Sequence, residues 1–196
     1  MIMDDLTGRL GEWLKGQGPE ADIVVSSRIR LARNLGNFPF IRRCTDIDRA
    51  NIESTVHSHV RSLNEFNDAL YIPVEDLDEL DRQFLVERQL ISRELSDGEG
   101  ARSVIVDPGE RFSVMINEED HLRVQVLRSG LQLSEAWQQM QSVDDALESR
   151  FDFAYSPRFG YLTACPTNLG TGLRVSLMLH LPALVLSKTA DKAFKA

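Results

Sequence analysis

The chain contains the stretch CPTNLGTGLRVSLMLHLP, residues Cys165–Pro182, which reads as a loop that runs into a strand. Pro166 disfavours helical backbone at Cys165, and Gly170 and Gly172 permit the tight or left-handed backbone of a loop. Backbone amides in such a loop can approach a ligand closely. The stretch therefore predicts a loop able to bind a ligand, leading directly into a strand.

Side chains alternate along the strand that follows this loop. Every second residue is polar or a methionine, and the residues between them are all aliphatic, as in a half-buried strand. The first set is Arg174, Ser176, Met178 and His180, and the second is Val175, Leu177, Leu179 and Leu181. We expect the aliphatic face to pack and the polar face to line a site.

A thiol before the loop and an arginine after it suggest an anion site beside a nucleophilic or charge-stabilising sulfur. The alternative is structural, because Gly-x-Gly pairs are common in hairpins and a lone cysteine is usually a small buried hydrophobic residue. Spacing alone favours the structural interpretation.

A second alternating segment spans Ile23 to Leu35 and places Arg28 and Arg30 on one side of a strand. At a rise of ~3.3 Å per residue, their guanidinium groups start about 6 to 7 Å apart and could span adjacent phosphates. The alternative is a solvated strand face with ion pairs to a neighbouring strand.

The middle of the chain predicts a hairpin, with residues 104–107 and 112–117 on either side of a Pro108-Gly109 turn. If the extended path continues beyond it, Glu119 and Arg123 share a face. That face would carry Asn117, Glu119, His121, Arg123 and Gln125, leaving Leu122, Val124 and Val126 for the core.

Helical periodicity predicts helices over residues 6–14, 46–63, 133–150 and 183–196, with Thr45 and Ser134 as N-caps of the second and third. A short strand is expected over 69–73, a helix after the acidic run at 75–81, and a hairpin over 151–163. We predict one α+β domain, residues 1–196, with a mainly antiparallel sheet flanked by helices.

Composition excludes several classes of function. The 196 residues carry a net charge of −8 with a pI near 5.0, which disfavours a nucleic-acid binder. Neither a signal peptide nor a membrane span is visible, so we expect a cytoplasmic protein without membrane contact. The two cysteines, Cys44 and Cys165, lack metal-binding spacing; we expect reduced thiols and assign no metal ligands.

Three segments in order resemble the phosphagen (ATP:guanidino) kinase family. They are CPTNLGTGLR from Cys165, SSRIRLARN from Ser26 and NEEDHLR from Asn117. The resemblance implies transfer of the γ-phosphoryl group of ATP to a guanidine nitrogen, with Mg²⁺, and the catalytic-domain fold of that family.

The resemblance also implies roles for particular residues. Glu119 is expected to orient the guanidine and accept its proton, with Glu118 in support and Cys165 acting as a thiolate beside the guanidinium. Nucleotide contacts are expected from Ser26, Ser27, Arg28, Ile29, Arg30, Gln89, Arg123, Arg174, Val175, Ser176, Leu177 and Met178. Gln89 stands where the family usually has a histidine, so that contact differs in charge and stacking.

The position of the motifs resembles the bacterial protein-arginine kinases, because only about two dozen residues precede Ser26. The resemblance implies arginine-bearing protein substrates, an activator protein, Clp-type protease machinery and a homodimer. The family continues with further motifs after this point, so we expect a domain truncated at its C-terminal end. The alternatives are a truncated, non-catalytic nucleotide- or arginine-binding regulatory module and a kinase for a free guanidino compound.

Overall fold

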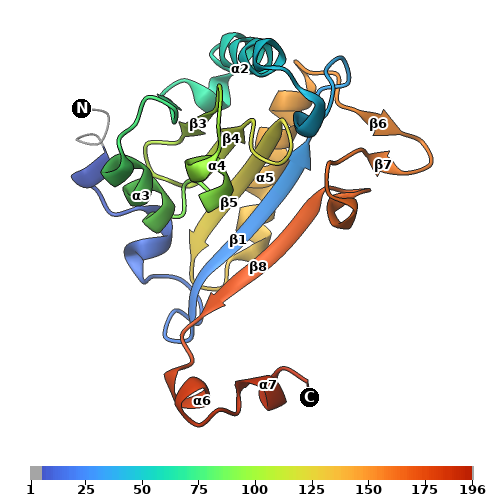
Figure 1. Cartoon of the computed structure of the whole chain (residues 1–196). Helices are drawn as coiled ribbons and strands as arrows, with labels where there is room; N and C mark the ends of the chain where they lie inside the picture. Colours follow the sequence, from blue (N-terminus) through green and yellow to red (C-terminus); the bar gives the residue numbers. More distant parts are fainter. Residues whose placement is uncertain (1–5, 196) are drawn as a thin grey trace.

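A computed structural model describes residues 6–195 of the chain. Its centre is a six-stranded sheet in the order β2-β3-β4-β5-β1-β8 (Figure 1). Each pair of neighbours in the sheet is antiparallel, which confirms the predicted α+β class. The strands are β1 (Val24–Arg33), β2 (Leu70–Pro73), β3 (Ser103–Val106), β4 (Phe112–Ile116), β5 (Leu122–Ser129) and β8 (Leu173–Leu179).

The helical elements surround this sheet. The α-helices are α2 (Asp46–Val60), α3 (Glu79–Glu87), α4 (Arg93–Asp97), α5 (Leu133–Glu148), α6 (Pro182–Leu186) and α7 (Ala190–Ala193). The 3₁₀ helices are η1 (Glu12–Lys15), η2 (Ile41–Arg43), η3 (Asn64–Phe66) and η4 (Pro166–Asn168). A small hairpin of β6 (Tyr155–Ser156) and β7 (Gly160–Tyr161) projects beside the sheet (Figure 1). Within the described residues, no helix is long and apolar enough to span a bilayer.

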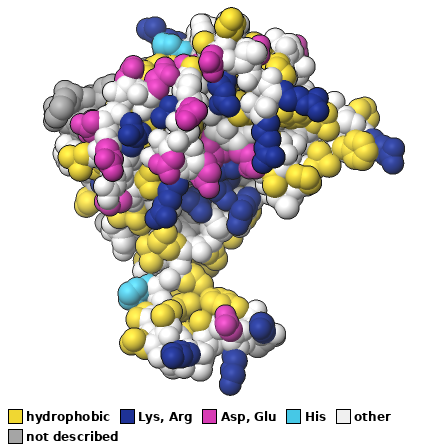
Figure 2. All heavy atoms as spheres, in the orientation of Figure 1, with side chains coloured by type: hydrophobic (Ala, Val, Ile, Leu, Met, Phe, Trp, Pro, Cys, Tyr) yellow, Lys and Arg dark blue, Asp and Glu magenta, His cyan; other side chains and the backbone are white. Residues whose placement is uncertain are grey.

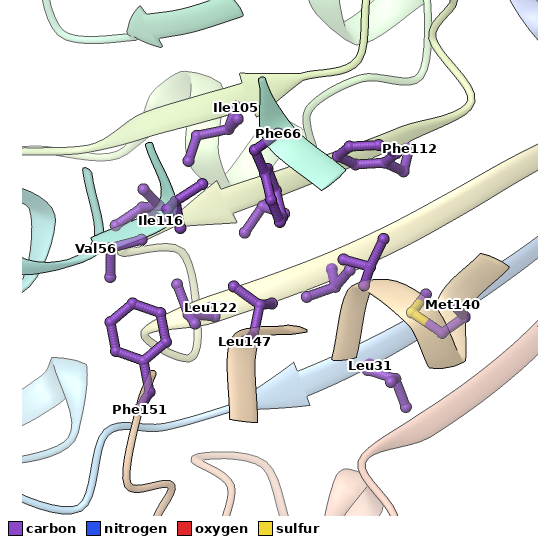
Figure 3. Close-up of a cluster of buried hydrophobic side chains, with 14 of the residues drawn as sticks. Leu31, Val56, Phe66, Ile105, Phe112, Ile116, Leu122, Met140, Leu147 and Phe151 are labelled. Atoms are coloured by element: carbon purple, nitrogen blue, oxygen red, sulfur yellow. The ribbon is translucent and has the colours of Figure 1, made fainter. Parts of the chain in front are cut away.

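One face of the sheet is covered by α2 and α5. The predicted N-cap Thr45 is confirmed at the start of α2, and it forms a capping box in which Thr45 and Asp48 satisfy each other's backbone N–H groups. Ile52 and Val56 of α2 and Met140 and Leu147 of α5 join the same core cluster as the inward side chains of β1, β4 and β5 (Figure 3). Each fully buried aliphatic side chain contributes roughly 1.5–3 kcal/mol, so this layer fixes the position of the central strands.

The opposite face is covered only at one end. Leu85 and Leu90, from α3 and the turn after it, and Leu95 of α4 pack against Val104 and Met115 of β3 and β4 in a second cluster. The remaining part of this face belongs to β5, β1 and β8. Figure 2 shows acidic and basic side chains gathered in the middle of the molecule on this side.

The aliphatic side chains on one side of β8 are not buried as predicted. Val175 is 47% exposed and Leu177 is 41% exposed, although both alternate with polar residues as a buried face requires. Strand β8 is the last strand of the sheet, and β1 is its only partner within the described residues. The alternation correctly indicated which side chains share a face of the strand, but whether that face is buried depends on the elements that pack against it.

Several predicted boundaries are wrong. The helix expected over 6–14 is limited to residues 6–7 and the separate 3₁₀ helix η1, with Leu10 exposed. Helix α5 begins after Gln132, so Ser134 lies inside it and is not its cap. The expected helix over 183–196 is divided into the short helices α6 and α7, which extend away from the sheet (Figure 1), and its last residue, 196, lies outside the described residues.

Candidate active site

Strands β5, β1 and β8 place basic side chains side by side on the open face. In the antiparallel register, Arg30 of β1 lies opposite Arg174 of β8, and Arg28 lies opposite Ser176. On the other side of β1, Ala32 lies opposite Arg123 of β5. Residues opposite one another in antiparallel strands project from the same face. The register therefore brings together arginines that are far apart in the sequence.

These arginines repel one another electrostatically. Burial lowers the pKa of Arg28, and the nearby charges of Arg174 and Arg123 lower it further. The pKa of Arg30 is lowered to about 10, first by burial and then by Arg28, Arg123 and Arg174, with Glu118 acting in the opposite direction. Clustered cations whose charged forms are destabilised are typical of a site that receives an anion.

Two of these arginines have free guanidinium groups. Among residues 6–195, neither Arg30 nor Arg174 makes a hydrogen bond or an ion pair with another side chain or with the backbone. Arg28, in contrast, donates to Ser176 Oγ at 3.2 Å and to Gln89 Oε1 at 3.2 Å. The free donors of Arg30 and Arg174 are available to a multivalent anion such as a polyphosphate.

The acidic turn between β4 and β5 approaches the same face. The Glu118 side chain is inaccessible to solvent, and it is held by an ion pair with Arg123, by Ser92 Oγ at 2.6 Å and by the Glu119 backbone N–H at 2.7 Å. The Glu119 side chain is 36% exposed and meets Arg123 Nη2 at 3.3 Å. Glu118 is thus fully engaged, whereas Glu119 has a carboxylate free to act on a ligand.

The acidic turn departs from the extended path that the sequence suggested. Asn117 has a φ of 61°, which ends β4 and starts a turn that the Asn117 N–H closes by donating to His121 O at 2.9 Å. Beyond this turn, Arg123 and Gln125 of β5 lie on the predicted face. Within the turn, His121 is buried away from the site, accepting from Leu35 N at 2.9 Å and lying 2.8 Å from Pro39 O. Asn117 is also buried, bonded to backbone carbonyls. The predicted placement of Asn117 and His121 on the reactive face is therefore wrong.

Cys165 precedes the 3₁₀ helix η4 in the loop that leads to β8. Its Sγ lies 3.0 Å from Thr167 Oγ1, and the residue is partly exposed. A cavity of about 560 Å³ joins this thiol to the charged groups described above. The lining includes Arg30, Arg123 and Arg174 together with Glu118, Glu119 and Cys165. The cavity therefore combines cations, a carboxylate and a thiol from four separate segments.

A smaller cavity of about 180 Å³ lies beside the first and shares Arg30 with it. Its lining includes Arg28, Gln89 and Gln125. Gln89 follows α3 in left-handed backbone, with a φ of 62°, and this turn directs its amide toward Arg28. Gln89 therefore holds one of the clustered guanidinium groups in place.

The loop of Cys165 is anchored at its far end by Arg33, the last residue of β1. The Arg33 guanidinium pairs with Asp144 of α5 at 2.6 Å, donates to Thr171 O at 2.9 Å and stacks on the Tyr161 ring at 3.7 Å. Its side chain is only 3% exposed. Arg33 therefore serves the architecture of the loop and does not reach the cavity.

The structure does not bring every predicted nucleotide-contact residue to this face. Ser27 and Ile29 project to the opposite side of β1, where Ser27 Oγ donates to Gly130 O and Ile29 joins the core. Val175 and Leu177 pair with Ile29 and Ser27 and share that opposite side. Ser26 and Met178 pair with each other on the arginine face, but at the far end of the strands, and they line neither cavity.

Some lining residues were not singled out from the sequence. Arg42 of η2 and Glu94 of α4 are exposed residues at the larger cavity, and Ser92, Thr167 and Asn168 also line it. These residues come from a 3₁₀ turn, a helix cap and a loop, so no strand or helix periodicity marks them. Within residues 6–195, no group of three His, Cys, Asp or Glu side chains is arranged to hold a metal ion.

An open antiparallel sheet face with clustered arginines opposite a carboxylate and a thiol defines a class of site suited to phosphoryl transfer onto a basic group. The chain belongs to the ATP:guanido phosphotransferase family, whose C-terminal catalytic domain matches residues 51–196.

Named relatives agree with this assignment. A protein-arginine kinase of Symbiobacterium thermophilum is 51% identical over 185 residues, covering 93% of this chain and 52% of that protein. A protein-arginine kinase of Moorella thermoacetica is 47% identical over 191 residues, covering 96% of this chain and 55% of that protein. The chain thus spans about half the length of the curated relatives it matches.

Solved structures show the same fold. The duplicated taurocyamine kinase from Schistosoma mansoni, with bound transition-state-analogue components, is 27% identical with a TM-score of 0.80, covering 89% of this chain and 26% of that chain. Lombricine kinase is 26% identical with a TM-score of 0.75, covering 90% of this chain and 53% of that chain.

Proposed function

We propose that this protein transfers the γ-phosphoryl group of ATP to the guanidine of arginine side chains in proteins. The observation that carries the proposal is the larger cavity, where the free guanidinium groups of Arg30 and Arg174 face the carboxylate of Glu119 and the thiol of Cys165. We also propose that residues 1–196 act as one catalytic-domain-like unit. The names of the relatives support arginine in proteins as the acceptor.

The clustered arginines would bind the triphosphate of ATP. The charges of Arg123 and Arg174 lie close enough to lower the pKa of Arg28 and of Arg30, and a polyanion would relieve this repulsion. Phosphoryl transfer depends mainly on alignment and on neutralising spread negative charge, which planar guanidinium groups do well. Mg²⁺ would neutralise phosphate charge and would be held mainly by phosphates and water, since residues 6–195 offer no ready-made cluster of metal ligands.

Glu119 would orient the guanidine and accept its proton. The acceptor nitrogen attacks the γ-phosphorus, the bond from phosphorus to the ADP oxygen breaks, and the proton lost by the guanidinium passes to the Glu119 carboxylate. Glu118 cannot take this proton as readily, because Arg123, Ser92 and the Glu119 N–H already occupy its oxygens. Cys165 would face the guanidinium as a thiolate and polarise it without forming a covalent bond.

The experiment combines the chain with ATP, Mg²⁺ and an arginine-rich protein, and measures acid-labile phosphate on that protein. The matched acceptor is the same protein with lysine in place of each arginine, and the matched enzyme is Glu119→Gln. We expect phosphate on the arginine protein alone, and only with the parent chain. Transfer to free arginine or creatine alone would favour a small-molecule kinase.

A non-catalytic binding module is the second candidate, favoured by the fact that the chain spans about half the length of its relatives. It predicts ATP binding without phosphate transfer to any acceptor, and that result would overturn the kinase proposal. Isothermal titration of ATP, run beside the transfer assay, separates the two functions.

The cellular setting is also part of the proposal. We propose a cytoplasmic protein, because ATP is available there and the free thiols of Cys44 and Cys165 suit a reducing compartment. An activator protein, Clp-type protease machinery and a homodimer are proposed partners that rest on the resemblance to protein-arginine kinases. Binding to nucleic acid is not proposed, given the net charge of −8.

A further inference from the structure

Asp120 follows the carboxylate of Glu119 in the sequence but points away from the cavity. It is fully buried, and its Oδ1 accepts two hydrogen bonds. One comes from the backbone N–H of Ala164 at 2.7 Å, and the other from Asn34 Nδ2 at 2.6 Å. Ala164 is the residue before Cys165. Through this one buried oxygen, Asp120, which follows Glu119, is bonded to Ala164, which precedes Cys165.

Asn34 completes this connection from the end of β1. Its Nδ2 also donates to Leu162 O at 3.1 Å, and its Oδ1 accepts the His121 backbone N–H at 2.9 Å. Asn34 is 2% exposed, so these bonds are shielded from water. Three segments that are distant in sequence meet here: the acidic turn, the end of β1 and the approach to Cys165. We call this set Asp120, Asn34 and Ala164 the bracket.

The bracket is costly for stability. Asp120 Oδ2 is buried and has no hydrogen-bond partner within residues 6–195. An unsatisfied buried carboxylate oxygen is unfavourable, and a smaller neutral residue would avoid its desolvation. In return, its two hydrogen bonds fix the separation of the segments that it joins. That combination is expected of a residue that positions a site and not of one that mainly stabilises a core.

We propose that Asp120 is a positioning residue that fixes the distance between the Glu119 carboxylate and the Cys165 thiol. This inference rests on the proposed function, because it gives those two groups a shared guanidine to hold. Misplacement of a reacting group by about 1 Å can cost about 100-fold in rate. Releasing Ala164 should therefore affect the rate of transfer more than the binding of ATP, whose arginines stand on β1, β5 and β8.

The test uses Asp120→Ala in the full chain carrying Cys44→Ser, so that Cys165 is its sole thiol. The matched control is Asp107→Ala, because Asp107 is also a buried carboxylate that accepts backbone N–H bonds, at the β3–β4 turn. We expect amide hydrogen exchange of residues 163–170 to rise at least about tenfold in Asp120→Ala alone. Alkylation of Cys165 by iodoacetamide should rise at least about threefold because the loop is freed.

Kinetics supply an independent readout. We expect kcat for transfer to fall about 10- to 100-fold in Asp120→Ala, with the Kd for ATP within about threefold of the parent. Asp120→Asn retains an oxygen that can accept the Ala164 N–H, so it should restore most of the rate and the slow exchange. Asn34→Ala loosens the bracket while leaving the sequence of the acidic turn intact, and it tests the same loop exchange if Asp120→Ala does not fold.

The outcomes separate this inference from the proposed function. Unchanged exchange and alkylation at 163–170 in both Asp120→Ala and Asn34→Ala would overturn it, as would exchange that rises equally throughout the sheet. If the parent chain transfers no phosphate, the kinase proposal fails, while the exchange and alkylation data still decide whether Asp120 holds the Cys165 loop. Loosening of the loop with an unchanged kcat would overturn the positioning role.

Discussion

Replacing Arg30 with glutamine tests whether the arginine cluster is built to receive an anion. The pKa of Arg30 is lowered to about 10, below the ordinary arginine value. At 1.36 kcal/mol per pH unit, that difference corresponds to about 3 kcal/mol of unfavourable free energy in the charged form. Arg30 is partly exposed and its aliphatic stem contributes packing, so we reduce the expected effect to about 1–2 kcal/mol. Arg30→Gln should therefore stabilise the unliganded protein by that amount.

The dependence of this effect on pH has a definite sign. Folding lowers the pKa of Arg30, so the cost of its charge is fully present below about pH 10. This cost is lost as the pH rises through about 10 toward the ordinary arginine value, and the parent gains stability relative to Arg30→Gln there. At neutral pH, the variant should unfold about 2–8 °C higher than the parent in phosphate-free buffer. ATP should raise the melting temperature of the parent much more than that of the variant.

Urea denaturation at low and high salt provides the assay and its control. Salt screens repulsion between arginines, so the advantage of Arg30→Gln should shrink by about half or more between 0.02 and 0.5 M NaCl. Arg111→Gln is the matched control, because Arg111 pairs with Asp107 at 2.6 Å and should lose stability instead. A destabilised Arg30→Gln at low salt, or a gain that does not respond to salt, would refute the explanation by charge repulsion.

Three other substitutions address the rest of the site. Glu119→Gln should lower the transfer rate, measured as acid-labile phosphate, about 10²- to 10⁴-fold. Its Kd for ATP, measured by titration calorimetry, should stay within about threefold of the parent. A transfer rate near that of the parent would exclude Glu119 as the base. Cys165→Ser should lower the transfer rate about tenfold or more. It should change the free energy of unfolding by less than about 1 kcal/mol, since the thiol is partly exposed. Equal losses of activity and stability would contradict the proposed role of the thiol beside the guanidinium. Arg33→Met should lower the free energy of unfolding, measured by urea denaturation, by about 3–5 kcal/mol, because it leaves Asp144 buried and unpaired. The double variant Arg33→Met with Asp144→Leu should recover most of that loss. No recovery would show that the broken ion pair is not the reason for the loss.

Local sequence was sufficient for the central strands and for the two long helices α2 and α5, and for the orientation of side chains along those strands. Arg28 and Arg30 lie on one face of β1 because successive side chains in a strand alternate, which needs no knowledge of the partner strand. Helix α2 begins directly after its N-cap Thr45, because the cap bonds to a residue only three positions away in the sequence. The hairpin of β3 and β4 follows from its Pro108-Gly109 turn.

Positions that depend on contacts between distant segments were not predictable. The left-handed φ of Asn117 begins a turn, and within that turn His121 is buried, because the alternation of side chains holds only where the backbone is extended. The aliphatic side of β8 remained exposed because burial depends on what covers a face, and alternation cannot report that. The bracket at Asp120 arises from a turn and a loop, and Arg42 and Glu94 come from helices of only three and five residues, so no sequence period marks them.

The sequence by itself therefore determined the family, the elements and the side of each strand on which its arginines project. Only the tertiary structure decided that Arg30, Arg123 and Arg174 share one cavity with Glu119 and Cys165, since strand register sets which distant residues lie opposite one another. The physical reason is that backbone periodicity acts over a few residues, whereas strand order, coverage and buried polar contacts are properties of the assembled chain.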